Sequence, residues 1–337
     1  MNAVKMGRIA RLGTNDKAVG MLLGTNDKAV VEWKHNGFSS EVKLHFIFEA
    51  ELRLTMLKSL FRFLSPRFQN LFLEYKVDFK PRYGHGLAPH AELLSLIEER
   101  RDQYAVWIEK ALRHREALWA IKKADQEQDS KKVVWNNGFL PGLDIAMIYT
   151  FIAECKPKKY VEVGSGNSTK VAYKAVQEHQ LDTKIISIDP QPRAEIDALA
   201  HTVLRMPFEN SQINLPEMLE EGDILFIDNS HRILPNSDAM VFFMEVLPRL
   251  KKGVWVHLHD IYLPFDYPDF MCDRFYSEQY GLAMYLLANP KRYATAFPNY
   301  FVSEDPSLSK QISPLWNHEN LEGVERHGGS YWIRIED

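Results

Sequence analysis

From residue 158 onward, short apolar runs alternate with longer stretches in which apolar residues recur at helical spacing. Most positions in the short runs are apolar and many are β-branched, which is typical of parallel strands buried on both faces. Strands are expected over residues 159–163, 184–189, 201–206, 223–228 and 253–259, with a final edge strand over 328–334. Helices are expected over residues 168–180, 192–200, 215–220, 237–250 and 273–288. This alternation predicts a Rossmann-like, doubly wound α/β sheet with right-handed crossovers.

The first part of the chain follows a different pattern. Alternating apolar and polar positions over 42–54, with turn residues upstream, predict an antiparallel β segment over residues 1–54. It contains the direct repeat Leu-Gly-Thr-Asn-Asp-Lys-Ala-Val, at 12–19 and 23–30, which we interpret as a local duplication. A helical region is expected over 55–132, with one long helix over 91–124 whose apolar stripe would pack between lobes or subunits. Residues 133–337 are expected to form the Rossmann-like domain.

Composition narrows the classes of function. The 337 residues carry 41 Lys and Arg against 45 Asp and Glu, a formal net charge of −4, so a dedicated nucleic-acid surface is not expected. No apolar run is long enough to cross a membrane or to form the core of a signal peptide. The two cysteines, Cys155 and Cys272, have neither disulfide-scaffold nor zinc spacing. A cytoplasmic protein with a small-molecule partner is therefore expected.

The sequence at 160–169 is the sharpest local signal for ligand binding. Gly164 and Gly166 follow a predicted strand and open a predicted helix, which Asn167 or Ser168 would cap. In open α/β sheets, ligands bind outside the carboxyl ends of the strands, near the point where the strand order reverses. The glycines therefore mark a place where a ligand can approach the backbone closely.

Two further residues refine the nature of that ligand. Asp189 ends the next predicted strand, where a carboxylate can accept hydrogen bonds from both hydroxyls of a ribose. Thr169 stands where a dinucleotide fingerprint has its third glycine, which counts against a bound pyrophosphate. The pair favours a nucleoside cofactor without a pyrophosphate.

Together, the Glu162-x-Gly164-x-Gly166 run, Asp189 and the strand at 223–228 resemble class I S-adenosylmethionine-dependent methyltransferases. Over roughly residues 90–335, the wider pattern is similar to a bacterial subfamily of small, largely uncharacterised methyltransferases acting on small molecules. The matching pieces are Trp135-Asn136-Asn137, Pro141-Gly142-Leu143-Asp144, 164–169, 189–193, Asp228-Asn229-Ser230-His231, His259-Asp260-Ile261 with Leu263-Pro264, 276–280 and His327-Gly328-Gly329. The resemblance implies a seven-stranded sheet with one antiparallel strand, and S-adenosylmethionine as the cofactor.

The resemblance also implies which residues surround that cofactor. Its zwitterionic amino-acid end would meet a carboxylate and the glycine-rich turn, its ribose would meet an acid, and its adenine would lie near residues 207–210. The residues expected to contact it are Glu162, Gly164, Ser165, Gly166, Asn167, Ser168, Asp189, Glu209 and Asp228.

The acceptor side of the site is expected at the ends of the fourth and fifth strands. Methyl transfer requires alignment of acceptor and methyl group and exclusion of water, and a hydroxyl acceptor also needs a base or a metal ion. His231, His259 and Asp260 are the expected catalytic residues, because all follow the carboxyl ends of predicted strands. His257 lies deeper on the same strand and is expected to be a hydrogen-bonded core histidine. Trp135 and the aromatic loop 262–270 are expected to wall the acceptor pocket.

A divalent cation such as Mg²⁺ is an alternative to a histidine base. Asp228 and Asp260 occupy places similar to those of metal-binding acids in some natural-product O-methyltransferases. His259 stands where a second acid often lies, and this disfavours Mg²⁺, which prefers oxygen ligands.

The leading hypothesis is therefore methylation of a hydroxyl on a small polar molecule, such as a saccharide or a secondary metabolite. One alternative is a non-catalytic cofactor-binding or assembly protein on the same fold, and another is a nicotinamide-linked oxidoreductase, which Thr169 disfavours. The N-terminal part and the long helix are expected either to mediate contacts in a homo-oligomer or to cap the acceptor pocket.

Overall fold

The computed structural model describes residues 20–25, 28–33, 59–66, 69–192 and 194–337, and the chain divides after Val77 into two compact units. In the first unit, β1 (Gly20–Thr25) and β2 (Lys28–Trp33) pair antiparallel, and residues 59–64 are helical. The strand expected over 42–54 and the first copy of the repeat lie outside the described residues.

The second unit, Asp78–Asp337, is built on a seven-stranded sheet. The strand order is β5-β4-β3-β6-β7-β9-β8, and only β9 runs against the other six. The strands are β3 (Lys159–Val163), β4 (Lys184–Ile188), β5 (Thr202–Leu204), β6 (Ile224–Ile227), β7 (Trp255–His259), β8 (Tyr293–Pro298) and β9 (Ser330–Ile335). The predicted fold class and single antiparallel strand are confirmed. The strand order reverses between β3 and β6, which places a topological switch point there.

The last predicted strand exists, but it is not at the edge of the sheet. β9 lies between β7 and β8, and β8 forms the edge instead. The sequence of β8, Tyr-Ala-Thr-Ala-Phe-Pro, has little β-branching and ends in proline, so it gave no strand signal.

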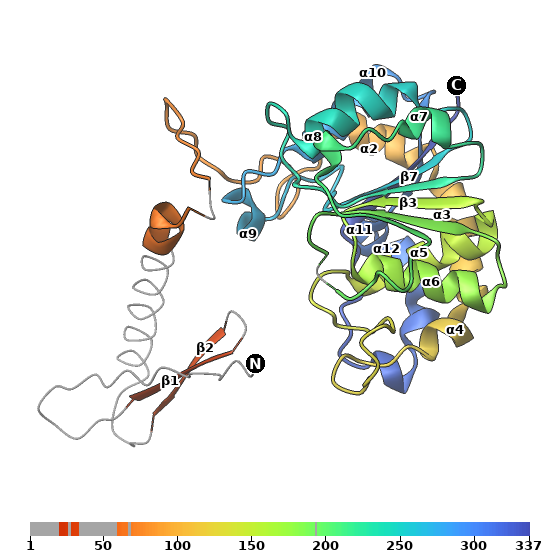
Figure 1. Ribbon diagram of the computed structural model, residues 1–337, viewed down its shortest axis with the longest axis horizontal. Coiled ribbons are helices and arrows are strands. Elements are labelled where there is room, and N and C mark those ends of the chain that lie inside the picture. Colours follow the sequence, from red (N-terminus) through yellow and green to blue (C-terminus); the bar gives the residue numbers. More distant parts are fainter. Residues whose placement is uncertain (1–19, 26–27, 34–58, 67–68, 193) are drawn as a thin grey trace, which may run out of the picture. The chain divides into compact units, whose positions relative to one another are not determined.

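Helices cover both faces of the sheet. In Figure 1, α7 (Leu215–Met218), α8 (Asp238–Val241) and α10 (Glu278–Ala288) lie on one side. On the other side lie α5 (Gly142–Cys155), α6 (Asn167–Glu178), α11 (Asn299–Glu304) and α12 (Pro306–Ile312). The short helix α9 is Asp269–Cys272. Among the helices of the described residues, none combines the length and apolar character needed to cross a bilayer.

Two predicted helices have other forms. Residues 192–200 contain turns and bends but no helix within their described part. The helix predicted over 237–250 changes its hydrogen bonding along its length, from α8 through a π-helical turn, Phe242–Val246, to a 3-10 turn, Leu247–Arg249.

The single long helix predicted over 91–124 is wrong, because the segment forms three helices: α2 (Ala91–Glu98), α3 (Arg101–Arg113) and α4 (Arg115–Trp119). At the first break, the Tyr104 hydroxyl donates to the carbonyl of Ile97 at 2.8 Å, which occupies a helical acceptor. Arg101 pairs with Asp305 of the neighbouring α12 cap. The contact with Asp305 lies beyond the predicted helix and was not visible in its spacing.

These helices belong to the same core as the sheet, so residue 132 does not separate two compact units. Phe151 of α5 stacks between Trp107 of α3 and Trp332 of β9, with ring centroids 3.8 Å apart on each side. Trp135 is fully buried in this core and does not wall an acceptor pocket as predicted. The observed division after Val77 follows from this packing.

Candidate active site

The turn after β3 lies at the switch point of the sheet. Gly164 has φ 81°, and a Cβ atom at this position would be 1.8 Å from the carbonyl oxygen of Asp228. The backbone N–H of Asp228 donates to Val163 at 2.8 Å, which brings the ends of β3 and β6 together. Glycine is required here by the fold, since any side chain would collide with the backbone after β6.

Glu162 and Thr169 hold the turn from beneath. Thr169 donates its hydroxyl to Glu162, Ser168 donates to the same carboxylate at 3.0 Å, and the N–H of Gly166 donates to Thr169 at 3.1 Å. Burial raises the pKa of Glu162 to about 8, and the hydroxyl donors offset only part of that effect. Glu162 therefore supports the turn at the start of α6. Thr169, which stands where a dinucleotide fingerprint has its third glycine, takes part in the same hydrogen bonds.

Asp189 links the loops that follow β3 and β4. One carboxylate oxygen accepts from the N–H of Ser165 at 2.8 Å and the other from the N–H of Gln191 at 2.7 Å. Each oxygen keeps a further lone pair, so the carboxylate can still accept from a ligand. The structure thus brings Asp189 to the glycine turn, as the spacing predicted.

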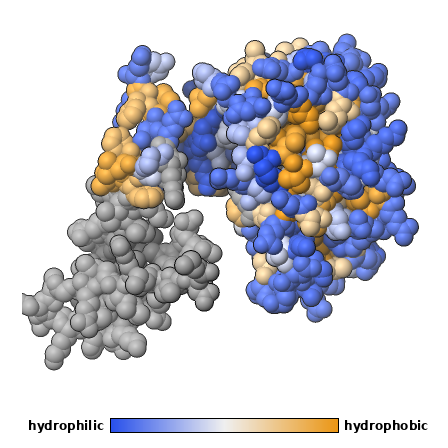
Figure 2. Space-filling model, in the orientation of Figure 1, coloured by the Kyte–Doolittle hydropathy of each residue, from blue (hydrophilic) through white to orange (hydrophobic). Residues whose placement is uncertain are grey.

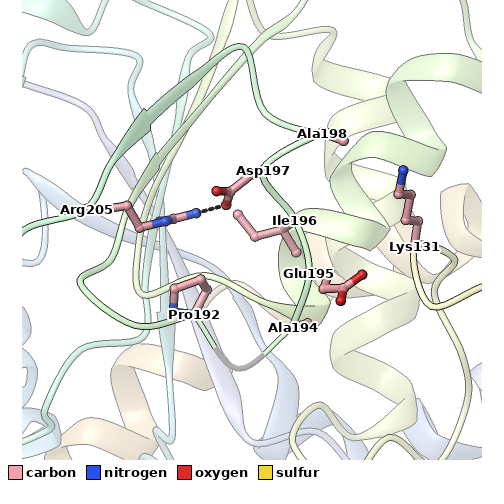
Figure 3. Close-up of a pocket in the computed structure, with 8 residues that line it drawn as sticks. All are labelled: Lys131, Pro192, Ala194, Glu195, Ile196, Asp197, Ala198 and Arg205. Carbon is pink, nitrogen blue, oxygen red and sulfur yellow. Dashed lines mark hydrogen bonds and ion pairs between the residues drawn. The ribbon is translucent and has the colours of Figure 1, made fainter. Parts of the chain in front are cut away.

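Two hollows lie in this region. A narrow one is lined by Phe139, Leu140, Ser165, Gly166, Asn167, Ser168 and Asp228, which includes five of the predicted cofactor residues. A cavity of about 410 Å³ lies by the loop after β4, where Figure 3 shows Arg205 reaching to Asp197 with Lys131 on the opposite side. Glu209, in the 3-10 turn Phe208–Asn210, lines neither hollow.

The ends of β6 and β7 carry a cluster of carboxyl and imidazole groups, here called the acid–imidazole cluster. His231 is buried, with Nδ1 hydrogen-bonded to Glu278. Its Nε2 lies 3.2 Å from Asp228 and 3.5 Å from Asp260. Burial lowers the pKa of His231, but the three carboxylates outweigh it and hold the pKa well above its usual value. The imidazole is therefore a cation at rest.

His259 occupies the centre of the same cluster. Its Nδ1 lies 3.4 Å from Asp260 and 3.7 Å from Asp228, and its Nε2 lies 3.7 Å from Asp144. Within the described residues, neither ring nitrogen makes a hydrogen bond. Burial lowers the pKa of His259, but Asp260, Asp228 and Asp144 together raise it by more. The pKa therefore lies above its usual value.

Asp144 and Glu278 are functional candidates to which the sequence reading gave no role. Asp144 is fully buried at the start of α5 and accepts hydrogen bonds from Asn299, Gly329 and Ser330. Burial raises its pKa, although His259 acts in the opposite direction. A signal did exist: both acids stand in largely apolar helices, where an unpartnered charge would be costly.

The cluster is acidic overall and its backbone is strained. It contains the carboxyl groups of Asp144, Asp228, Asp260 and Glu278 against the imidazoles of His231 and His259. His231 and Asp260 have φ 60° and 53°, left-handed conformations that non-glycine residues seldom adopt. Such strain persists where the surrounding structure fixes it, often at functional sites.

His257 is a core residue, as predicted, but not a hydrogen-bonded one. It is fully buried and stacks on Phe226 with ring centroids 4.4 Å apart. Within the described residues, neither ring nitrogen has a hydrogen-bond partner. Burial and the neighbouring His259 hold its pKa well below the usual value, so the ring is neutral.

The residues predicted to bind a metal do not form a metal centre in the described part of the chain. No group of three or more His, Cys, Asp or Glu side chains is arranged there to hold an ion. Asp228 and Asp260 instead face the imidazoles of His231 and His259.

Aromatic side chains stand beside the cluster. Tyr262, Tyr267 and Met271 form a small buried group, against which Cys272, Tyr276 and Tyr300 pack. The ring of Tyr276 lies 4.5 Å from that of His231. Aromatic residues of the loop 262–270 therefore pack with Tyr276 and Tyr300 beside the cluster, and their role as the wall of an acceptor pocket stays a prediction.

The chain is similar to known proteins in sequence and in fold. Residues 161–261 match the family model described as a methyltransferase domain. The fold is similar to that of the S-adenosylhomocysteine-bound methyltransferase PaMTH1 of Podospora anserina, at 15% identity, TM-score 0.36, and coverage of 71% of this chain and 97% of that one. It is also similar to the plantazolicin methyltransferase BpumL in complex with S-adenosylhomocysteine, at 11% identity, TM-score 0.36, and coverage of 73% and 100%. Among curated proteins, none matches.

The matched stretch runs from β3 to the residue after Asp260 and so contains the glycine turn, Asp189, Asp228 and both cluster histidines. The chain therefore contains a methyltransferase domain, the class of enzyme that its sequence predicted.

Proposed function

We propose that this chain is an S-adenosylmethionine-dependent methyltransferase that acts on a hydroxyl group of a small polar molecule. The observation that carries the proposal is the meeting of two features at one edge of the sheet. The glycine turn at the switch point and the acid–imidazole cluster share Asp228, which lines the narrow hollow and also faces both imidazoles.

The residues present fit the cofactor in charge and shape. The turn from Ser165 to Ser168 offers backbone at the start of α6, where an anionic carboxylate is favoured. Asp189 keeps acceptor capacity for the ribose hydroxyls. The surplus of carboxyl groups in the cluster complements a cationic sulfonium. Glu162 supports the turn from below and would act on the cofactor through Ser168 and Thr169.

When bound, S-adenosylmethionine supplies an electrophilic methyl group. The chain's own residues then have to orient the acceptor hydroxyl, exclude water and take up its proton. Asp260 is a carboxylate at the mouth of the cluster and can accept that proton directly. The pKa of His231 is held well above its usual value, so His231 would act as a base only after losing its proton, and as a cation it stabilises the developing oxyanion. The pKa of His259 is shifted in the same direction.

Calorimetry on the full chain tests the cofactor assignment. We expect S-adenosylhomocysteine to bind, and we expect Asp189→Ala to weaken binding about tenfold or more, since charge-assisted hydrogen bonds to the ribose are lost. Asp182→Ala is the matched control, because Asp182 is exposed just before the other end of β4. Absence of binding, or equal losses in both variants, would refute the assignment.

Methyl transfer itself separates the enzyme from a non-catalytic binding protein. With labelled S-adenosylmethionine and a pool of hydroxylated metabolites, we expect label in product that Asp260→Asn reduces about a hundredfold or more. A cofactor-binding but non-catalytic protein would transfer no label. Inhibition by a chelator, reversed by added Mg²⁺, would instead support the divalent cation that Asp228 and Asp260 could ligate.

We also propose that the segment before Val77 mediates contact with a second copy of the chain. Several of its large apolar side chains are exposed, and Figure 2 shows them as a cluster of apolar atoms. They include Leu60, Phe61, Phe63, Leu64, Leu71, Phe72, Leu73 and Tyr75. Exposed apolar patches of this kind are typical of interaction sites. The double variant Phe61→Ser with Phe72→Ser should lower the molar mass in solution, and an unchanged mass would contradict the proposal.

A further inference from the structure

The wall of the acid–imidazole cluster carries two arginines. Tyr276 packs against His231, and the guanidinium carbons of Arg232 and Arg274 lie 5.1 and 5.9 Å from the centroid of the Tyr276 ring. Arg274 also donates to the Tyr276 hydroxyl at 3.5 Å. A single aromatic ring thus connects two cations to the predicted catalytic histidine.

Backbone carbonyls hold the guanidinium group of Arg232 in place. Arg232 Nε donates to the carbonyl of Arg274 at 2.8 Å, and Arg232 also donates to the carbonyl of Ser230 at 3.0 Å. The N–H of Ser277 donates to the carbonyl of His231 at 2.8 Å. The segments that follow β6 and precede α10 are therefore joined by hydrogen bonds on either side of the arginines, and the two side chains project from a defined surface.

Neither arginine forms an ion pair with a residue that the structure describes. In the described part of the chain, no carboxylate oxygen lies within 4.0 Å of Arg232 or Arg274. Some other arginines of this unit, though not all, do have such partners: Arg101 contacts Asp305 at 2.7 Å, and Arg205 pairs with Asp197. The hydrogen bond to Tyr276 raises the pKa of Arg274, and the charge of Asp260 contributes a smaller part in the same direction.

The charges around the site explain what such arginines could recognise. The cluster has four carboxyl groups against two imidazoles, so an anionic acceptor would be repelled from it unless cations were provided nearby. Planar guanidinium groups with free N–H edges match carboxylate and phosphate groups in geometry as well as in charge. The aromatic rings of Tyr262, Tyr276 and Tyr300 offer an apolar surface beside them.

We propose that the methyl acceptor is an acid: its carboxylate or phosphate group binds Arg274 and Arg232, and its hydroxyl group faces Asp260 and His231. This inference rests on the proposed methyltransferase function and names the class of its substrate. The arginines act as specificity residues, because they admit an anionic molecule to a site whose reacting centre is itself acidic.

Paired acceptors test the inference on the full chain in the presence of S-adenosylhomocysteine. The pairs are glucuronate and glucose, glucose phosphate and glucose, and gallate and gallamide, with binding followed by calorimetry and ligand-observed NMR. We expect at least one acid to bind about tenfold or more tightly than its neutral counterpart. The pair that responds distinguishes a carboxylate from a phosphate and a sugar from an aromatic ring.

Variants assign the effect to the arginines. Arg274→Gln and Arg232→Gln should each weaken the binding of the acid about tenfold and leave the neutral partner unchanged, whereas Arg274→Lys should keep part of the preference. Arg115→Gln is the matched control, since Arg115 stacks on Trp119 in α4 at 5.4 Å and has no part in the cluster. Circular dichroism and the retained binding of S-adenosylhomocysteine show that each variant is folded.

The outcomes separate the two proposals. If S-adenosylhomocysteine binds but no acid binds more tightly than its neutral counterpart, or if both glutamine variants keep the preference, the acidic acceptor is refuted and the methyltransferase function stands. If S-adenosylhomocysteine does not bind to the unaltered chain, the proposed function itself fails.

Discussion

At the ends of β3 and β4, the polar side chains of the site have found their partners within the chain. Glu162 accepts from Ser168 and Thr169, and Asp189 accepts from two backbone N–H groups. At the ends of β6 and β7, the charges are more numerous and less satisfied. Within the described residues, both ring nitrogens of His259 and one oxygen of Glu278 lack a hydrogen bond.

The two regions are suited to different tasks. The first region offers backbone and one carboxylate on a rigid turn, as binding a cofactor requires. The second region holds several charged groups close together in a buried place. Such an arrangement costs stability, and it is retained where reacting groups must be stabilised. A change in the first region should therefore affect binding and folding together, whereas one in the second should alter proton affinities.

The largest effect is expected from Gly164→Ala. The new Cβ would collide with the Asp228 carbonyl, so the turn and the end of β6 would have to separate. We expect a loss of about 3 to 5 kcal/mol in unfolding free energy and the loss of S-adenosylhomocysteine binding. Gly222→Ala is the control: its φ of 86° is similar, but a Cβ there meets nothing within 4 Å, so about 1 to 2 kcal/mol should be lost and binding retained. If Gly164→Ala and Gly222→Ala had equal effects on unfolding in urea and on binding in calorimetry, the close approach of residue 164 to the Asp228 carbonyl would be contradicted.

Glu162→Gln should change how stability depends on pH. The folded-state pKa of Glu162 is raised to about 8, so the carboxyl stays protonated in the fold while the unfolded chain ionises above its usual pKa. Stability should then fall as the pH rises from about 4.5 to 8, by about 5 kcal/mol at most. The glutamine variant should flatten this fall, measured by urea unfolding across the range. The exposed control Glu217→Gln should show the same fall of stability with pH as the unaltered chain. If Glu162→Gln showed that fall as well, the carboxyl of Glu162 would have to be ionised in the fold.

Glu278→Gln tests the second region. Removing one buried carboxylate should lower the pKa of His231, because Glu278 is its closest acidic neighbour, and NMR titration of histidine ring protons can follow it. A raised histidine pKa stabilises the fold fully below pH 6.5, and that contribution is lost as the pH rises through the folded-state value. The variant should lose about 3 to 5 kcal/mol at neutral pH. The exposed control Glu245→Gln should leave both quantities unchanged, and an unmoved His231 titration would refute the pairing.

These expectations also show what the sequence could and could not reveal. The strands from β3 to β7 and the glycine turn depend on local apolar runs and on turn residues, so they were predictable. Asp144 was not, because its partners Asn299 and Ser330 come from strands and helices more than a hundred residues away. The break between α2 and α3 likewise involves a contact of Arg101 with Asp305, which lies about two hundred residues outside the helix pattern.

The smallest effect is expected at His257, which shares a strand with His259 but lies in the core. His257→Phe should change the unfolding free energy by about 1 kcal/mol at neutral pH, since the ring already stacks on Phe226 and its nitrogens make no hydrogen bond within the described residues. Its pKa is lowered by burial, so the native histidine loses stability as the pH falls below 6.5, and the phenylalanine variant should be the more stable protein at acid pH. His259→Phe is the matched comparison: it leaves Asp144 without its imidazole neighbour and Asp260 with His231 alone, so it should be destabilising at neutral pH and should shift the titration of His231. If His257→Phe and His259→Phe had the same effects in urea unfolding and NMR titration, the assignment of His257 to the core and of His259 to the acid–imidazole cluster would be wrong.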